Sequence, residues 1–195
     1  MNLALALTIG RILLAPVFLV IYLYYVPLGI SLLALPFVLI GLVALAELSD
    51  LFDGMAARHA NQVTELGKIL DPMADSIFRL SVFLTLTQGF VNLPLWLVLL
   101  FFYRDSVISM LRTICALRGY ALAARFSGKV KAVVQGVAAF TILGLMIPYA
   151  FGVLKLGLFQ DISFYVALGA AVYSLFSGVE YLRANQSYIK KALVK

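Results

Sequence analysis

The stretch from Ile12 to Ala46, I-L-L-A-P-V-F-L-V-I-Y-L-Y-Y-V-P-L-G-I-S-L-L-A-L-P-F-V-L-I-G-L-V-A-L-A, has no charged residue in 35 positions. A membrane-spanning helix needs about 20 apolar residues, so this stretch is too long for one span. The sequence V-P-L-G at positions 26–29 is typical of a turn and divides it. We therefore predict two membrane helices, from about Leu5 to Tyr25 and from about Gly29 to Leu51.

The rest of the chain has the same apolar character. Of its 195 residues, 64% are hydrophobic and 12% are charged, whereas a soluble domain carries roughly 25% charged residues. Four more spans are predicted near 66–88, 93–117, 131–151 and 163–182, the first of them starting between 66 and 71 with Pro72 in its first turn. These patterns predict an all-α integral membrane protein with six transmembrane helices in a single domain, residues 1–195.

Basic residues concentrate in alternate connections and in the C-terminal tail. The opposite connections carry only Lys155. Because basic residues favour the cytoplasmic side, both termini and the basic connections are predicted to be cytoplasmic. Tyr22 and Trp96 are then expected in the outer aromatic belt. The net charge of +6 suits anionic lipid headgroups, and no nucleic-acid partner is expected.

A polar segment, D-L-F-D-G-M-A-A-R-H-A-N-Q-V-T-E-L-G-K-I-L-D-P-M-A-D, runs from position 50 to position 75. Asp50 and Asp53 are three residues apart, and Asp71 and Asp75 are four apart, so each pair shares one face of a helix. Four adjacent carboxylates repel one another and need a compensating charge. Oxygen ligands favour Mg²⁺, Mn²⁺ or Ca²⁺, and two carboxylate pairs suit two ions that clamp phosphoryl oxygens. The small residues Gly54, Ala57 and Gly67 leave room for a ligand beside the helix backbones.

The pattern D50-x2-D53-G54-x2-A57-R58-x8-G67-x3-D71-x3-D75 resembles the complete signature of the CDP-alcohol phosphatidyltransferase family. Family members transfer the phosphate-bearing group of a CDP-linked lipid or alcohol to a hydroxyl and release CMP. The resemblance implies that the four aspartates hold Mg²⁺ or Mn²⁺ and that Asp75 also accepts the proton of the attacking hydroxyl. It further implies that the CDP donor is bound by Asp50, Gly54, Ala57, Arg58 and Gly67.

The predicted helix at 93–117 carries Arg104, Asp105 and Arg112 within otherwise apolar sequence. Charged side chains there are costly unless they face the interior and find partners. The planar guanidinium group of arginine fits phosphate well. Arg104 can alternatively form a structural ion pair with Asp105 or with a motif aspartate. The run G128-K129-V130-K131 opens the next predicted helix, where free N–H groups suit an anion.

The runs R104-D105-x3-S109-x2-R112 and G128-K129-V130-K131 resemble the phosphatidylglycerophosphate synthase branch of that family. The resemblance implies CDP-diacylglycerol as the donor and glycerol 3-phosphate as the acceptor. The acceptor phosphate would be bound by Arg104, Arg112, Lys129 and Lys131. It also implies a six-helix homodimer in a bacterial cytoplasmic membrane, with the active site facing the cytoplasm. Beyond residue 135 the last two predicted helices are merely apolar.

Two alternatives remain open from the sequence. The same chemistry can use another acceptor, such as inositol phosphate, serine or another alcohol. The aspartates can instead form the permeation site of a divalent-cation transporter, although they lie at the membrane edge and no discontinuous helix pair is evident. Glu47, one turn before Asp50, either supports the site or pairs with Arg11.

Overall fold

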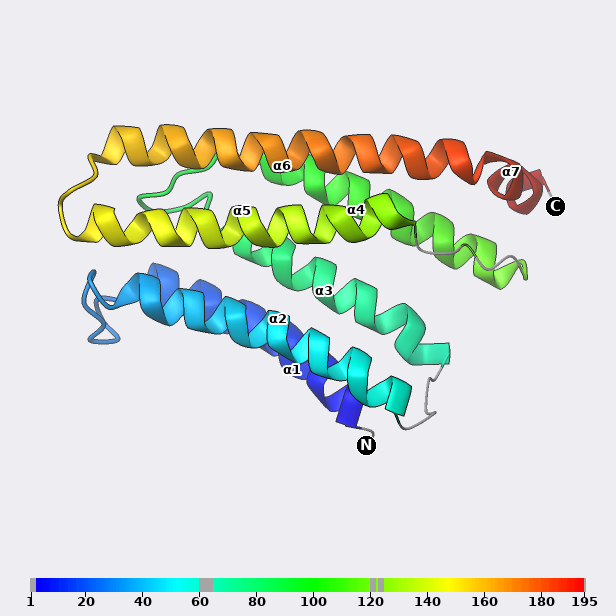
Figure 1. Ribbon diagram of the computed structural model, residues 1–195, viewed down its shortest axis with the longest axis horizontal. Helices are drawn as coiled ribbons and strands as arrows, with labels where there is room; N and C mark the ends of the chain where they lie inside the picture. The colour runs from blue at the N-terminus through cyan, green and yellow to red at the C-terminus, as the bar shows by residue number, and fades with distance from the viewer. Residues whose placement is uncertain (1–2, 60–64, 120–121, 123–124, 195) are drawn as a thin grey trace.

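The computed structural model describes the backbone of residues 3–59, 65–119, 122 and 125–194, and the side chains of residues 8–49, 73–119, 122 and 125–190 (Figure 1). This part of the chain is all-helical and contains no strand, which confirms the predicted α class. The helices are α1 (Leu3–Leu23), α2 (Leu35–His59), α3 (Glu65–Thr85), α4 (Leu95–Leu117), α5 (Phe126–Ala150), α6 (Leu156–Ala184) and α7 (Gln186–Val194).

The six long helices correspond to the six predicted ones, but several helix starts differ. α2 begins at Leu35 and not near Gly29, because Gly29 has a φ of 73° that no helix accommodates. α3 begins at Glu65, so Pro72 lies inside the helix and not in its first turn. α5 begins at Phe126, five residues before the predicted start. The short helix α7 was not predicted.

Consecutive long helices run in opposite directions (Figure 1). The α1–α2, α3–α4 and α5–α6 connections lie at one end of the bundle, on the left of the view. The C-terminal ends of α2 and α4, the starts of α3 and α5, and helix α7 lie toward the other end. α1 packs on α2 and α3, whereas α6 packs on α4 and α5. The polar motif and the basic run of α5 are therefore placed at the same end.

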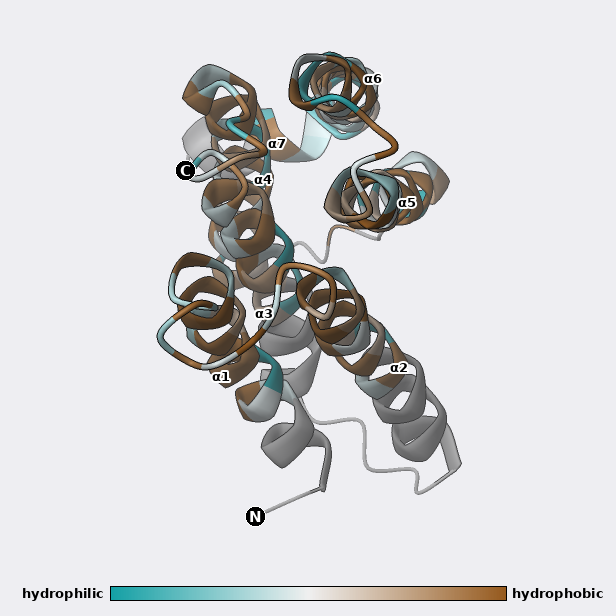
Figure 2. Cartoon of the chain, turned by 90° about the vertical axis from the view of Figure 1, so that its left-hand side faces the viewer, coloured by the Kyte–Doolittle hydropathy of each residue, from teal (hydrophilic) through white to brown (hydrophobic). Residues whose placement is uncertain are grey.

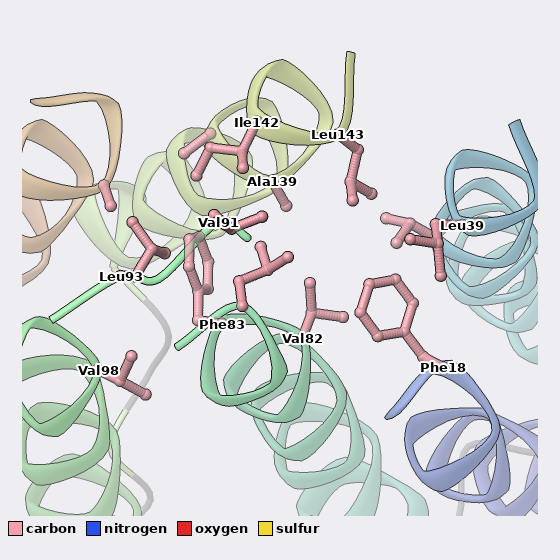
Figure 3. Packing of buried hydrophobic residues seen from close by; sticks show 14 of the residues in the cluster. Phe18, Leu39, Val82, Phe83, Val91, Leu93, Val98, Ala139, Ile142 and Leu143 are labelled. Atoms are coloured by element: carbon pink, nitrogen blue, oxygen red, sulfur yellow. The ribbon is translucent and has the colours of Figure 1, made fainter. Parts of the chain in front are cut away.

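A single apolar core joins the six long helices. Phe18 of α1, Leu39 of α2, Val82 of α3 and Leu143 of α5 are each almost fully buried and point toward one another (Figure 3). The α3–α4 connection adds Val91 and Leu93 to the same cluster. Among the described residues, this cluster contains no charged side chain, and the buried charged side chains discussed below lie on its side toward the motif.

The outward faces of the long helices are also apolar. Figure 2 shows brown, the colour of hydrophobic residues, over much of the described part of these helices. Large side chains such as Leu13, Phe37, Val137 and Phe176 are exposed. Within the described residues, α5 and α6 are long and apolar enough to cross a membrane, and 8–23 and 35–49 are shorter apolar helices. Apolar residues on both the inside and the outside of a helix bundle are the character of a membrane protein.

Tyr22 corrects one expectation about the aromatic belt. Its side chain is buried, and its hydroxyl donates to the Gln88 carbonyl (2.9 Å) and accepts from the Val91 N–H (3.3 Å). Gly89 makes room for this ring, since a Cβ at Gly89 would lie 3.0 Å from the hydroxyl oxygen. Trp96, in contrast, is half exposed in the first turn of α4. Tyr22 therefore anchors the α3–α4 connection and does not face lipid.

Candidate active site

The motif aspartates lie on two helices. Asp50 and Asp53 belong to the C-terminal half of α2, and Asp71 and Asp75 belong to the first half of α3. Both segments are helical, so the helical spacing assumed for each pair holds. The side chains of Asp50, Asp53 and Asp71 lie outside the described residues, as do those of the donor-site residues. Their convergence on two metal ions, and the donor contacts of Gly54, Ala57, Arg58 and Gly67, stay predictions.

Arg79 of α3 links the two motif helices. Its Nε and Nη2 donate to the two carboxylate oxygens of Glu47 on α2, at 3.0 and 2.9 Å. Its Nη1 donates to Oδ2 of Asp75, at 2.9 Å. The guanidinium is nearly buried, with 9% of its side chain exposed. One arginine therefore joins the turn before Asp50 to the carboxylate of Asp75.

The partner of Glu47 is thus Arg79 and not Arg11, which donates instead to Ser49 at 3.4 Å. The prediction from sequence missed Arg79. The sequence contained a pattern that indicates Arg79, because this arginine, four residues after Asp75, interrupts apolar sequence in the same way as Arg104 does. An acid placed four residues before a base on a helix is also a favourable ion-pair spacing.

A second charged cluster lies between α4, α5 and α6. Lys131 Nζ donates to both oxygens of Asp105, at 3.0 and 2.9 Å. Arg104 donates to Asp105 Oδ1 through Nη1 and to Ser177 Oγ through Nη2, both at 2.9 Å. Two of the four predicted acceptor ligands therefore converge, and Arg104 makes the ion pair with Asp105 that the sequence left open as a structural alternative. Two cations share one carboxylate, so the cluster has an excess positive charge that an anionic group would balance.

Arg112 and Lys129 do not join that cluster. The Arg112 guanidinium carbon lies 5.1 Å from the centre of the Tyr181 ring, and its Nε donates to the Tyr181 hydroxyl at 3.1 Å. Its Nη1 and Nη2 make no hydrogen bond within the described part of the chain. Lys129 is exposed on α5. Arg112 is therefore oriented by an aromatic ring while its terminal nitrogens stay available.

The expected free N–H groups at 128–131 are not present. Because α5 begins at Phe126, the N–H groups of Gly128 and Lys129 both donate to the Arg125 carbonyl, at 3.1 and 3.3 Å. Any anion bound by this run must therefore contact side chains.

α6 contributes more than apolar surface, which corrects the expectation from sequence. Ser174, Ser177, Gly178 and Tyr181 are all buried. Ser177 contacts Arg104, and Tyr181 contacts Arg112. A Cβ at Gly178 would lie 3.0 Å from Cγ of Arg104, so the missing side chain admits the arginine. The spacing i, i+3, i+4, i+7 of these small and polar residues was the available signal.

The Gly178→Ala substitution tests this packing. We expect it to lower the free energy of unfolding by about 1–3 kcal/mol, because the added methyl group forces Arg104 to shift. Thermal unfolding of the detergent-solubilised protein measures the effect. Gly169→Ala on the same helix is the matched control, since its Cβ would meet nothing within 4 Å. Equal melting temperatures for the two variants would contradict the proposed contact.

Comparison with known proteins decides the family. The model of the CDP-alcohol phosphatidyltransferase family matches residues 1–173. The chain belongs to this family. A CDP-diacylglycerol–glycerol-3-phosphate 3-phosphatidyltransferase of Bacillus subtilis is 32% identical over 149 residues, covering 76% of this chain and 74% of the relative. The protein of the same name from Escherichia coli K12 is 32% identical over 195 residues, covering 95% and 96%. A cardiolipin synthase (CMP-forming) of Streptomyces coelicolor is 40% identical over 78 residues, covering 40% and 36%.

As a CDP-alcohol phosphatidyltransferase, the protein is an enzyme of a family that uses divalent metal ions. Among the described residues no three metal-binding side chains form a group that could hold an ion, so such a site would need the motif acids outside them. Within the described residues, Glu47 and Asp75 carry two negative charges against the single positive charge of Arg79. Carboxylate oxygens are the donors that hard cations prefer. The oxygen donors at this end of α2 and α3 therefore suit a divalent cation.

Proposed function

We propose that this enzyme transfers the phosphatidyl group from CDP-diacylglycerol to glycerol 3-phosphate, giving phosphatidylglycerophosphate and CMP. The observation that carries the proposal is a pair of neighbouring clusters with opposite excess charge. The Glu47–Arg79–Asp75 cluster has excess negative charge, and the Arg104–Asp105–Lys131 cluster has excess positive charge. α3, which carries Arg79, packs on α4 and α5, which carry Arg104 and Lys131, so the two clusters lie on neighbouring helices. One suits a cation and the other suits a phosphate.

The four aspartates, Asp50, Asp53, Asp71 and Asp75, would hold two ions of Mg²⁺ or Mn²⁺. Bound there, the ions supply charge neutralisation for the pyrophosphate of the donor. The acyl chains of CDP-diacylglycerol lie in the bilayer, and its cytidine lies against Gly54 and Ala57. Arg58 and the backbone at Gly67 complete the donor site.

The acceptor hydroxyl attacks the phosphorus that carries the diacylglycerol group. A new oxygen–phosphorus bond forms, the bond to the CMP phosphate oxygen breaks, and CMP leaves. The proton of the attacking hydroxyl passes to the carboxylate of Asp75. Transfer of this kind depends mainly on positioning and charge stabilisation, so a strong base is not required.

The acceptor phosphate would bind at the second cluster. Arg104 and Lys131 supply the excess positive charge. Arg112, which lies outside this cluster on the same helix as Arg104, would add two nitrogens that have no other described partner. Lys129 is exposed at the start of α5, where it would attract the anion from the cytoplasm. A phosphorylated acceptor suits this site better than serine does.

The six long helices would cross a bacterial cytoplasmic membrane as a single domain, residues 1–195, with both termini and the active site on the cytoplasmic side. Antiparallel neighbours and the shared position of the motif and the basic α5 run support this topology. The functional unit would be a homodimer, as the family resemblance implies.

An acceptor panel tests the reaction. Purified protein, CDP-diacylglycerol and Mg²⁺ or Mn²⁺ are incubated with radiolabelled glycerol 3-phosphate, inositol phosphate, serine, glycerol or phosphatidylglycerol. We expect CMP release and labelled lipid with glycerol 3-phosphate at a kcat/KM far above that of the other acceptors. Preference for inositol phosphate or phosphatidylglycerol would keep the chemistry and overturn the acceptor.

The Arg112→Ala variant tests the phosphate contact. We expect the KM for glycerol 3-phosphate to rise about ten- to a hundredfold with little change in donor affinity, because a lost charge-assisted hydrogen bond costs about 1.5–3 kcal/mol. Arg112→Lys should restore only part of the loss, since lysine lacks the planar fork. Initial rates over a range of both substrates measure the effect.

Arg118→Ala is the control, because Arg118 is exposed at the end of the same helix and its loss removes the same charge. Its KM values should match those of the unmodified enzyme. An Arg112→Ala variant that weakens CDP-diacylglycerol binding equally would contradict the assignment of Arg112 to the acceptor.

A further inference from the structure

Arg79 is outside the motif that defines the family signature, yet its side chain donates three hydrogen bonds to acids on the two motif helices. We propose that Arg79 is a positioning residue that holds Asp75 and α2 in the relative placement that phosphatidyl transfer requires. The inference rests on the proposed function, because it assigns a purpose to Arg79 through Asp75 and the metal-binding helices.

Arg79 makes hydrogen bonds from two sides of its guanidinium group, and we call this arrangement the clamp. Its Nε and Nη2 contact Glu47 on α2, and its Nη1 contacts Asp75 on its own helix. The fork to Glu47 fixes the plane of the guanidinium, and the remaining edge then fixes where Oδ2 of Asp75 lies. The side chain is 9% exposed, so water competes little for these bonds. Asp75 is therefore held from the α2 side of the site.

The clamp reaches the first aspartate pair through the helix backbone. Glu47 is three residues before Asp50, one turn earlier on α2. Displacing Glu47 along or around α2 displaces Asp50 and Asp53 with it, because the helix moves as a rigid element. Arg79 thereby relates the position of Asp75 on α3 to that of the acids on α2. A metal site shared between two helices depends on this relation.

Charge neutralisation alone does not account for the choice of arginine. A lysine at this position would supply the same positive charge, but its single ammonium cannot meet both carboxylates in a fixed plane. Removing the charge altogether would favour cation binding, since a positive charge beside a metal site repels the ion. Positioning and simple repulsion therefore predict opposite results for two different variants.

The test compares Arg79→Lys and Arg79→Gln with the unmodified full-length protein in detergent. Steady-state kinetics with glycerol 3-phosphate give kcat and both KM values at saturating Mn²⁺. Titration with Mn²⁺ in the absence of substrate, followed by electron paramagnetic resonance, gives the ion affinity. Tyr22→Phe is the control, because it removes the two hydrogen bonds of the Tyr22 hydroxyl at the opposite end of the bundle. It should lower the melting temperature without changing kcat or Mn²⁺ affinity.

We expect kcat to fall about tenfold in Arg79→Lys and about a hundredfold in Arg79→Gln, with both KM values nearly unchanged. Arg79→Lys should also bind Mn²⁺ several-fold more weakly although its charge is retained. Unchanged kcat and Mn²⁺ affinity in a folded Arg79→Lys variant would overturn the proposal. So would an Arg79→Gln variant that binds Mn²⁺ more tightly and turns over normally, because Arg79 would then act only by repulsion.

These outcomes separate the inference from the proposed function. If the unmodified enzyme uses glycerol 3-phosphate as proposed, while the Arg79→Lys variant still binds Mn²⁺ normally and keeps its kcat, only the positioning role of Arg79 is overturned. Unmodified enzyme that binds Mn²⁺ but does not use glycerol 3-phosphate overturns the acceptor alone. In that case weaker Mn²⁺ binding by Arg79→Lys still supports the clamp.

Discussion

The Asp71→Asn variant is expected to lose phosphatidyl transfer by at least about a hundred- to a thousandfold while still inserting and folding. Asp71 is the first acid of the α3 pair and the proposed ligand that completes the metal site with α2. Replacing one carboxylate by an amide removes charge stabilisation where the transition state needs it. Radiolabelled lipid formation at ordinary Mg²⁺ concentrations measures the loss, and Asp50→Asn should behave in the same way.

Asp161→Asn is the matched control, because it removes one carboxylate from an exposed position near the start of α6. Its activity should equal that of the unmodified enzyme. Substantial transfer by Asp71→Asn or Asp50→Asn would count against a metal site built from both helices. Recovery of activity at high Mn²⁺ would support it, since a weakened site fills when the ion concentration rises.

The Asp75→Asn variant is also expected to have a large effect. We expect kcat to fall about a hundred- to ten-thousandfold, the usual contribution of a positioned general base, with a much smaller change in the KM for CDP-diacylglycerol. Asparagine keeps an oxygen that can accept from Nη1 of Arg79, so the clamp to α2 persists. What is lost is the negative charge and the ability to take the proton.

Two measurements separate the possible roles of Asp75. Steady-state kinetics give kcat and KM, and equilibrium binding of CDP-diacylglycerol gives the donor affinity. A variant that loses donor binding outright would show that Asp75 is a structural metal ligand and not the base. Loss of kcat with retained donor binding would support its role in proton transfer.

The apolar helices and the helical spacing of the motif aspartates could be predicted from local sequence. The uncharged stretch from Ile12 to Ala46 and the low charge of the whole chain predict apolar helices, because hydropathy is a property of each segment by itself. The helical pairing of Asp50 with Asp53 and of Asp71 with Asp75 is likewise local, since the three- and four-residue spacings depend only on the helix period. The family signature is a pattern of such spacings, and it was readable without any tertiary information.

The tertiary structure alone decided which charges meet. Glu47 pairs with Arg79 and not with Arg11, and Lys131 shares Asp105 with Arg104 while Arg112 lies over Tyr181. These choices depend on how each helix is rotated about its axis and how it crosses its neighbours. Helix rotation is set by packing of the whole core, so a side chain's partner on another helix cannot be read from its own segment.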